Sequence, residues 1–183
     1  MIPVPSFRAP TAIAAILATL VSLAACSPAP DATPSPTATP LFATEKEAFA
    51  AAEATYRAYT DASNATVLTD SDTFEAVFTW LRGDALTSAR KNYSEYHAGG
   101  VTRVGDSTFD HFAPGSYDAE ARTVVVTLCI DVSAVDVLDT EGHSVVPDDR
   151  PARRPLKVEL ASADTPTGLA IFSSTQTDTL TCE

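Results

Sequence analysis

The sequence predicts an α+β domain, with helices in the first half of the ordered region and an antiparallel sheet in the second. From residue 44 to residue 99, apolar side chains recur every three or four residues, which is the period of an amphipathic helix. From residue 101 onwards, β-branched residues and a two-residue alternation replace that period. Because the helical segments precede all of the strand segments, the helices are expected to cover one side of the sheet.

The first helix is expected to begin at a capping box, Thr44-Glu45-Lys46-Glu47, and to end near Ala62. In a capping box the threonine hydroxyl and the Glu47 carboxylate accept hydrogen bonds from backbone amides that have no partner within the helix. One inward-facing stripe of this helix follows from the spacing of Phe49, Ala52, Tyr56 and Tyr59.

Two shorter helices are expected before residue 101. The second begins at Ser71 or Asp72 and is stopped by Gly83, and the third is capped by Asp84 and ends at residues 99–100, a pair of glycines. Their inward-facing stripes are Phe74, Val77, Phe78 and Leu81 in the second helix, and Leu86, Ala89, Tyr93 and Tyr96 in the third.

The second half of the domain is expected to form an antiparallel meander. Residues 122–137 give the strongest strand signal because they are apolar on both faces, and their length predicts a bulge or bend near Ser133. A hairpin turn is expected at residues 139–142, where Gly142 supplies positive φ. The other expected strands are residues 101–112, which Ala113-Pro114-Gly115 breaks, residues 156–160 after a loop over residues 150–155, and residues 169–174.

Residues 1–25 predict an export signal. A short head with one positive charge, Arg8, precedes an apolar run over residues 11–25 that is too short to span a bilayer comfortably. The tetrad Leu23-Ala24-Ala25-Cys26 resembles the bacterial lipobox. By that resemblance Cys26 becomes the mature N-terminus and carries a diacylglycerol, with acyl chains such as palmitate, which anchors the protein on the extracytoplasmic face of the cell membrane. The alternative is an ordinary cleaved signal followed by an incidental cysteine.

Residues 26–43 are expected to form a spacer between the anchor and a domain over residues 44–183. After Cys26 this segment is mostly Pro, Ala, Ser and Thr. Its five prolines lack a backbone donor and fix φ, so neither a helix nor a strand is expected there.

The charge of the chain excludes some classes of partner. It has 12 basic and 24 acidic residues, a formal net charge of −12, and loss of Arg8 with the signal makes this −13. Such a balance argues against nucleic acid and against electrostatic docking on anionic lipid. The acyl chains on Cys26 are therefore expected to hold the protein at the membrane.

The three cysteines suggest one lipid site and one disulfide. If Cys26 carries lipid, Cys129 and Cys182 remain, and an oxidising extracytoplasmic compartment permits them to pair. Closing a loop of roughly 54 residues would stabilise the fold by about 4 kcal/mol in the chain-entropy model. Two free buried thiols are the alternative.

Three N-terminal helices followed by a long, bent antiparallel sheet resemble the NTF2-like fold of SnoaL-like and ketosteroid-isomerase-like proteins. The chain also resembles a group of NTF2-like lipoproteins of unassigned function from GC-rich Gram-positive bacteria, over about residues 44–183. That resemblance is carried by Thr-Trp-Leu-Arg-Gly-Asp-Ala-Leu at 79–86, Cys-Ile-Asp-Val-Ser at 129–133, Gly-Leu-Ala-Ile-Phe-Ser-Ser at 168–174, and Cys182. It implies a cone of helices packed on the sheet and supports the Cys129–Cys182 disulfide, but its motifs imply no activity.

The candidate catalytic residues are Asp131 and Tyr56, and no recognisable catalytic motif accompanies them. The sequence has no Gly-x-Ser-x-Gly, no glycine-rich phosphate loop, no Cys-x-x-Cys and no His-Glu-x-x-His, so no cofactor is expected. NTF2-like enzymes place an acid or base inside the cone, where desolvation raises the pKa of a carboxylate. Asp131 is the best candidate for this role, with Tyr56 and Tyr59 as hydrogen-bond donors. A structural or solvated Asp131 is favoured, because it shares a strand face with Cys129 and Ser133.

No metal site is expected from the three scattered histidines. Asp106, Asp110 and His111 form the nearest approach to a cluster, but residues 110 and 111 are expected to point to opposite faces of a strand. His97 is expected to interact with the C-terminal dipole of its helix, and His143 to be exposed beside a turn.

Two classes of function remain open. The first is a non-catalytic membrane-anchored lipoprotein whose domain binds an envelope protein or a small apolar ligand, and a homodimer through the sheet face is compatible with it. The second is a SnoaL-like or ketosteroid-isomerase-like enzyme with a carboxylate in its pocket. The state of the cone bears on both, because it is either open or filled by Phe49, Tyr56, Phe74 and Phe78.

Overall fold

A computed structural model describes residues 40–183 of the chain. The predicted export signal over residues 1–25, the predicted lipid site Cys26 and most of the predicted spacer lie outside these residues. Among residues 40–183, no helix combines the length and the apolar character that a membrane span requires. The elements in chain order are α1 (Glu45–Asn64), η1 (Ser71–Thr73), α2 (Phe74–Phe78), α3 (Gly83–Gly99), β1 (Thr102–Val104), β2 (Thr108–Asp118), β3 (Thr123–Asp131), β4 (Asp136–Leu138), β5 (Arg153–Ser162) and β6 (Leu169–Gln176).

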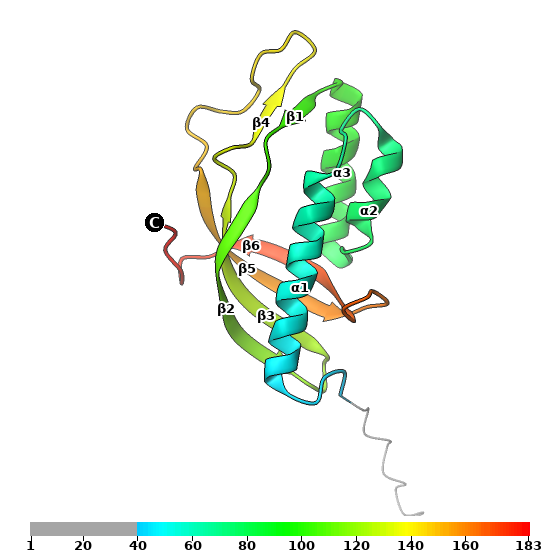
Figure 1. Cartoon of the computed structure of the whole chain (residues 1–183), viewed down its shortest axis with the longest axis vertical. Coiled ribbons are helices and arrows are strands. Elements are labelled where there is room, and N and C mark those ends of the chain that lie inside the picture. The colour runs from blue at the N-terminus through cyan, green and yellow to red at the C-terminus, as the bar shows by residue number, and fades with distance from the viewer. Residues whose placement is uncertain (1–39) are drawn as a thin grey trace, which may run out of the picture. The chain divides into compact units, whose positions relative to one another are not determined.

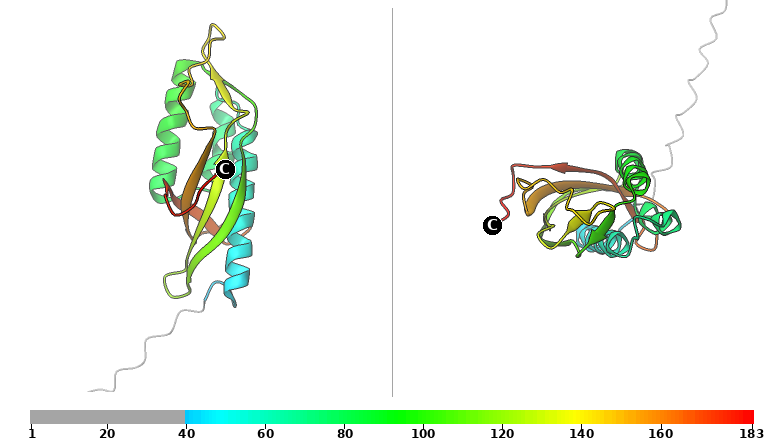
Figure 2. Two further views of the ribbon diagram at one scale, coloured as in Figure 1. Left: turned by 90° about the vertical axis from the view of Figure 1, so that its left-hand side faces the viewer. Right: turned by 90° about the horizontal axis from the view of Figure 1, so that it is seen from above.

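The fold is α+β, with helices in the first half and an antiparallel sheet in the second, which confirms the predicted class. Four strands pair in the order β2-β3-β5-β6, and each pairing is antiparallel. A separate two-stranded sheet pairs β1 with β4. Figure 1 and Figure 2 show a curved sheet with the helices on one side of it, while the C-terminal tail leaves the sheet on the side away from the helices.

The helix α1 begins as its capping box predicts. The Thr44 hydroxyl accepts a hydrogen bond from the amide of Glu47 at 3.2 Å. The Glu47 carboxylate accepts one from the amide of Ala43 at 3.0 Å, one residue before the cap. Two amides that the helix cannot satisfy are thereby paired, which stabilises the start of α1.

The second helix is shorter than predicted, and the third lacks its predicted cap. The α2 helix ends at Phe78 rather than at Gly83, because Thr79 and Trp80 form a turn and Leu81 then pairs with Ile171 of the edge strand β6. The amide of Ile171 donates to the carbonyl of Trp80, and the amide of Arg82 donates to the carbonyl of Ile171, each at 2.9 Å. The N-cap position of α3 is Arg82, whose side chain makes no capping hydrogen bond, and Asp84 instead lies in the first turn.

Gly83 is required where α3 begins. Its φ is +53°, a left-handed value that side chains disfavour, and an added Cβ would lie 2.6 Å from the Phe172 ring. Residues 79–86 and 168–174 are thus in contact through Gly83 and Phe172. This contact packs the start of α3 against the edge strand β6.

The strands differ from the prediction at two interruptions. Residues 101–112 split into β1 and β2, because Gly105 takes a φ of +75° and the Asn64 side chain binds the backbone of Ser107. The predicted break at Ala113-Pro114-Gly115 is wrong, since these residues lie inside β2, where register shifts accommodate them. A proline is tolerated there because β2 is an edge strand whose outward amides need no partner in the sheet.

The positions of the remaining strands agree more closely with those predicted from the sequence. The predicted strand over residues 122–137 is interrupted near Ser133, as its length suggested, and forms β3 and β4. The hairpin turn at residues 139–142 is present, and Gly142 has a φ of +86°. The predicted loop over residues 150–155 is partly wrong, since β5 already begins at Arg153.

The core lies between the inner face of the sheet and the helices. Ala48 and Ala52 are fully buried, and their small side chains let α1 approach the sheet closely. Along β3 and β5 the large aliphatic residues that are fully buried alternate, so their side chains point to the helix side. They are Val124, Val126 and Leu128 in β3 and Val158 and Leu160 in β5, and Leu169 and Ile171 of β6 are buried beside them.

Cys129 and Cys182 form a disulfide, which confirms the predicted pair and excludes two free thiols. Their Cα atoms are 5.7 Å apart, and the bond closes a sequence separation of 53 residues. The Cys129 side chain belongs to the outer face of β3 and is nevertheless fully buried. The C-terminal tail covers it, and the amide of Thr177 donates to the carbonyl of Pro155 at 3.1 Å.

Candidate ligand-binding cavity

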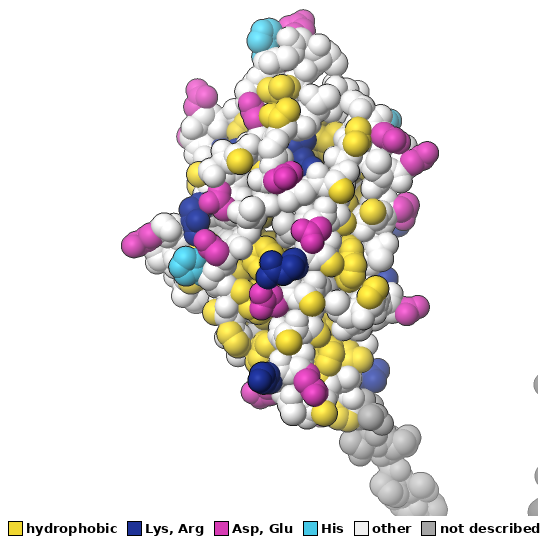
Figure 3. Space-filling model, in the orientation of Figure 1, with side chains coloured by type: hydrophobic (Ala, Val, Ile, Leu, Met, Phe, Trp, Pro, Cys, Tyr) yellow, Lys and Arg dark blue, Asp and Glu magenta, His cyan; other side chains and the backbone are white. Residues whose placement is uncertain are grey.

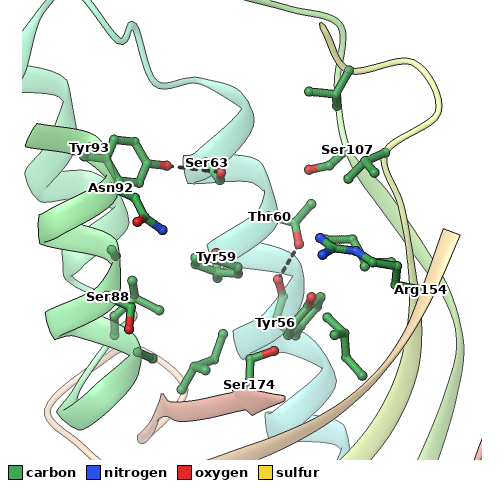
Figure 4. Close-up of a pocket in the computed structure, with 18 of the residues that line it drawn as sticks. Tyr56, Tyr59, Thr60, Ser63, Ser88, Asn92, Tyr93, Ser107, Arg154 and Ser174 are labelled. Atoms are coloured by element: carbon green, nitrogen blue, oxygen red, sulfur yellow. Dashed lines mark hydrogen bonds between the residues drawn. The ribbon is translucent and has the colours of Figure 1, made fainter. Parts of the chain in front are cut away.

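A cavity of about 720 Å³ lies between α1, α3 and the inner face of the sheet. Figure 4 shows α1 and α3 with the side chains that line it. The cone is therefore open. Tyr56 lines the cavity, whereas Phe74 and Phe78 pack in the core against the ring of Tyr93, and Phe49 packs beside that core.

The lining of the cavity is partly apolar and rich in hydroxyl groups. Its apolar side chains come mainly from the sheet and from the segment just before α3. Its hydroxyl groups come mainly from the helices and from β6. Such a mixture suits a small molecule with an apolar body and a few polar groups. The apolar members include Leu81, Ile130, Val132, Leu156 and Ile171, and the hydroxyl members include Tyr56, Tyr59, Thr60, Ser63, Ser88, Tyr93 and Ser174.

The two tyrosines of α1 are neutral hydrogen-bond donors at physiological pH. Burial raises the pKa of Tyr59 to about 12, and the neighbouring Tyr93 adds to this shift. Burial also raises the pKa of Tyr56, while the charge of Arg154 acts in the opposite direction. Because both phenols keep their protons, they can donate to a ligand but cannot serve as phenolate bases.

Three arginines line the cavity, and their positions were not predicted from the sequence. Arg103 donates to the carbonyl of Asn64, and Arg150 donates to the carbonyls of Val132 and Val135 at 3.0 and 2.7 Å. The bond from Arg103 joins β1 to the end of α1, and the bonds from Arg150 join the loop before β5 to the segment between β3 and β4. Arg154 lines the cavity from β5, and Figure 4 shows its side chain reaching towards α1.

Asp131 lies outside the cavity, on the opposite face of β3. Its neighbours Ile130 and Val132 line the cavity, so the alternation of the strand directs Asp131 outwards. The Ser133 hydroxyl and amide donate to one Asp131 oxygen at 2.6 and 2.9 Å, and Arg153 donates to the other at 3.2 Å. The bonds from Ser133, with the charge of Arg153, lower the pKa of Asp131, the opposite of the shift that a pocket base would need.

Arg153 joins Asp131 to Asp110 on this outer face. Its guanidinium donates to both oxygens of Asp110 at 2.7 and 2.8 Å, a bidentate pair. This contact, followed by the one from His111, lowers the pKa of Asp110. The arrangement is an ion-pair cluster that links β2, β3 and β5 across the sheet.

The ion-pair cluster predicts a specific acid sensitivity. Asp110 and Asp131 have folded pKa values below their unfolded values of about 4, so their contribution to stability is complete above about pH 4. It is lost as the pH falls through the lowered folded values. We expect Arg153→Met to flatten the dependence of unfolding free energy on pH below about pH 4, as measured by urea unfolding. Arg90→Met is the control, because it also removes an arginine, but one that lies over the Phe78 ring and is not part of the ion-pair cluster. Equal slopes for wild type and Arg153→Met would contradict this prediction.

The histidines do not converge on the cavity. The expectation that Asp110 and His111 point apart is wrong: His111 has a φ of +49° at an irregularity of β2, so its Nδ1 lies 2.8 Å from Asp110 Oδ1. His97 lies in the last turn of α3, and its Nδ1 is 3.1 Å from the carbonyl of Leu68. His143 is exposed at the hairpin tip, as predicted, near Asp139 and Glu141.

The chain matches no protein-family model and no curated protein. Several solved structures have a similar course of the chain. One is a candidate aromatic ring hydroxylase from Novosphingobium aromaticivorans, with 13% identity and a TM-score of 0.48, covering 72% of this chain and 88% of the other. All of these solved structures are only distantly similar to this chain. The intermembrane-space region of the chloroplast protein ARC6 shares 16% identity with a TM-score of 0.48, over 68% and 92% of the two chains, and Aln2 from a Streptomyces species shares 15% with 0.42, over 72% and 90%.

Proposed function

We propose that this protein is an exported lipoprotein, anchored through Cys26, whose NTF2-like domain binds a small, largely apolar molecule without transforming it. The lipobox and the proline-rich spacer support export and anchoring. The disulfide between Cys129 and Cys182 fits an oxidising compartment. Helices on one side of a curved antiparallel sheet support the NTF2-like assignment.

The observation that carries ligand binding is the cavity itself. Its volume of about 720 Å³ lies within the usual range for small-molecule sites, roughly 300–1,000 Å³. Apolar side chains from β3, β5 and β6 can contact the body of a ligand, and phenol and alcohol groups from α1 and α3 can orient it. A core that had collapsed onto the sheet would offer neither.

Binding without catalysis is favoured by the position of the carboxylates. Among the described residues that line the cavity, Asp84 is the only carboxylate, and it is exposed in the first turn of α3. Asp131, the candidate base, is paired with Ser133 and Arg153 on the other face of the sheet. A buried carboxylate with a raised pKa, which proton transfer in such a cone would use, is therefore lacking among these lining residues.

Filling the cavity is expected to abolish ligand binding without unfolding the domain. Ser88 lies on α3 and lines the cavity (Figure 4), so an indole at this position would occupy ligand space. We expect Ser88→Trp to weaken the binding of 2-naphthamide, a neutral aromatic probe, by at least about tenfold. The measurement is calorimetric titration of the full lipoprotein in detergent micelles, with the heat of titration into empty micelles subtracted.

Ser94→Trp is the matched control, because Ser94 is exposed on the same helix and does not line the cavity. It is expected to keep the wild-type affinity to within about twofold. If Ser88→Trp and Ser94→Trp bind the probe equally well, ligand binding in this cavity is ruled out.

A further inference from the structure

We infer that the ligand of this cavity is an organic anion and that Arg154 recognises its negatively charged group. The inference rests on the ligand-binding function proposed above and adds the chemical class of the ligand. The expected ligand has a carboxylate or a similar anionic head on a flat apolar body. Four features of the structure support this: the direction of Arg154, its lack of an acidic partner, the positive charge around the cavity and the surfaces beside Arg154.

Adjacent arginines of β5 point to opposite faces of the sheet. Residues paired across an antiparallel ladder share a face, and Arg153 pairs with Asp131 while Arg154 pairs with Ile130. Arg153 therefore joins the outer ion-pair cluster, whereas Arg154 lines the cavity beside Ile130. The two side chains have the same chemistry, and a single step along the strand gives them different surroundings.

Arg154 has no carboxylate partner among residues 40–183. No ion pair or hydrogen bond joins its guanidinium to another described side chain or backbone group, and its buried Nε lacks a hydrogen-bond acceptor. A partly buried guanidinium loses hydration, and without an acceptor nothing replaces it. An anion that enters the cavity would supply that acceptor, in the bidentate geometry that a guanidinium favours.

The charge around the cavity also favours an anion. Within residues 40–183, Arg103 and Arg150 donate to neutral carbonyl oxygens and none of the three lining arginines forms an ion pair, while the lining includes one carboxylate, Asp84. This is notable in a chain with a net charge of −12, and Figure 3 shows acidic side chains spread over the face of the domain. A positive interior in an acidic protein selects for negative charge at this one place.

The surfaces beside Arg154 complete the site. Tyr56 is close enough for the charge of Arg154 to affect its pKa, and its protonated phenol can donate a second hydrogen bond to an anionic head. Leu156 follows on the same strand face, and Tyr59 lies on the facing helix, so an apolar body would contact both. The head and the body of the ligand are thus each matched by lining residues.

The test compares two probes that differ in charge and share their rings, 2-naphthoate and 2-naphthamide. Each is titrated by calorimetry into the full lipoprotein in micelles, with subtraction of the heat from empty micelles. We expect the wild type to bind the naphthoate at least tenfold more tightly than the amide. Arg154→Met is expected to weaken naphthoate binding by 10- to 100-fold and to leave the amide within threefold.

Arg153→Met is the matched control, because it removes the same charge from the neighbouring residue on the outer face. It is expected to leave both affinities within about twofold, and Arg154→Lys to retain part of the preference for the anion. If wild type binds both probes equally, or if Arg153→Met and Arg154→Met have equal effects, the anion inference is overturned while ligand binding stands. If neither probe binds, both proposals fail. Should Arg154→Met not fold by circular dichroism, the wild-type ratio and Arg154→Lys decide the question.

Discussion

Replacing Cys26 by alanine is expected to release the protein from the membrane fraction. The proposed anchor consists of two acyl chains on this cysteine, and each buried methylene contributes about 0.8 kcal/mol to membrane partitioning. Two chains hold a protein stably, so their loss is expected to shift it from almost complete retention to almost complete release. The measurement is partitioning between detergent-rich and aqueous phases after expression in a bacterium that processes lipoproteins.

Intact mass gives a second readout of the same change. The wild-type protein is expected to begin at Cys26 and to carry the mass of its acyl groups, whereas Cys26→Ala should lack that mass. Ser27→Ala is the control, since it changes a neighbouring residue and keeps the thiol. A wild-type protein that begins elsewhere, or that carries no added mass, would disprove the anchor and leave an ordinary cleaved signal as the explanation.

Removing the disulfide is expected to cause a large loss of stability. The double variant Cys129→Ala/Cys182→Ala should unfold with a free energy lower by about 2–5 kcal/mol, and the chain-entropy model gives about 4 kcal/mol for a loop of this length. The disulfide holds the C-terminal tail over the outer face of β3, so its loss also exposes the site of the buried Cys129 side chain. Urea unfolding followed by circular dichroism measures the change.

Reduction of the wild type provides the control for the double variant. Dithiothreitol should lower the stability of the wild type by a similar amount and leave the double variant unchanged. If the double variant and the oxidised wild type unfold at the same urea concentration, the disulfide does not stabilise the fold. A change confined to the tail would instead appear as faster proteolysis after residue 176, with unchanged unfolding of the sheet.

Local signals in the sequence were sufficient for the elements that local contacts stabilise. The start of α1 depends on Thr44 and Glu47, which bond to amides within four residues. The end of α3 depends on Gly100, whose φ of +63° suits glycine. Alternation along β3 also indicated which face would be buried. In these places the residues that determine the structure are neighbours in the chain.

The errors arose where distant contacts decide the structure. The end of α2 depends on the pairing of Trp80 and Arg82 with Ile171, about 90 residues later, which no helical period reveals. The tolerance of Pro114 depends on β2 being an edge strand, and strand order is a property of the whole sheet.

The arginines of the cavity were missed for a related reason. Residues 150–155 were predicted as a loop, so the alternation of Leu156, Val158 and Leu160 was not extended back to Arg154. That alternation was the one available signal that Arg154 faces inwards. The cavity itself depends on the spacing between α1, α3 and the sheet, which the sequence pattern does not specify.

The opposite directions of Arg153 and Arg154 also bear on how the chain avoids misalignment during folding. If β5 were to slip by one residue against β3, Arg153 would turn inwards and lose both of its carboxylate partners, and Leu156 and Leu160 would turn towards water. Both charge and hydrophobicity would then oppose the shifted arrangement. The outer ion-pair cluster therefore favours the native register of β5 against β3. Without these ion pairs, a larger fraction of the molecules is expected to become trapped with β5 out of register during folding.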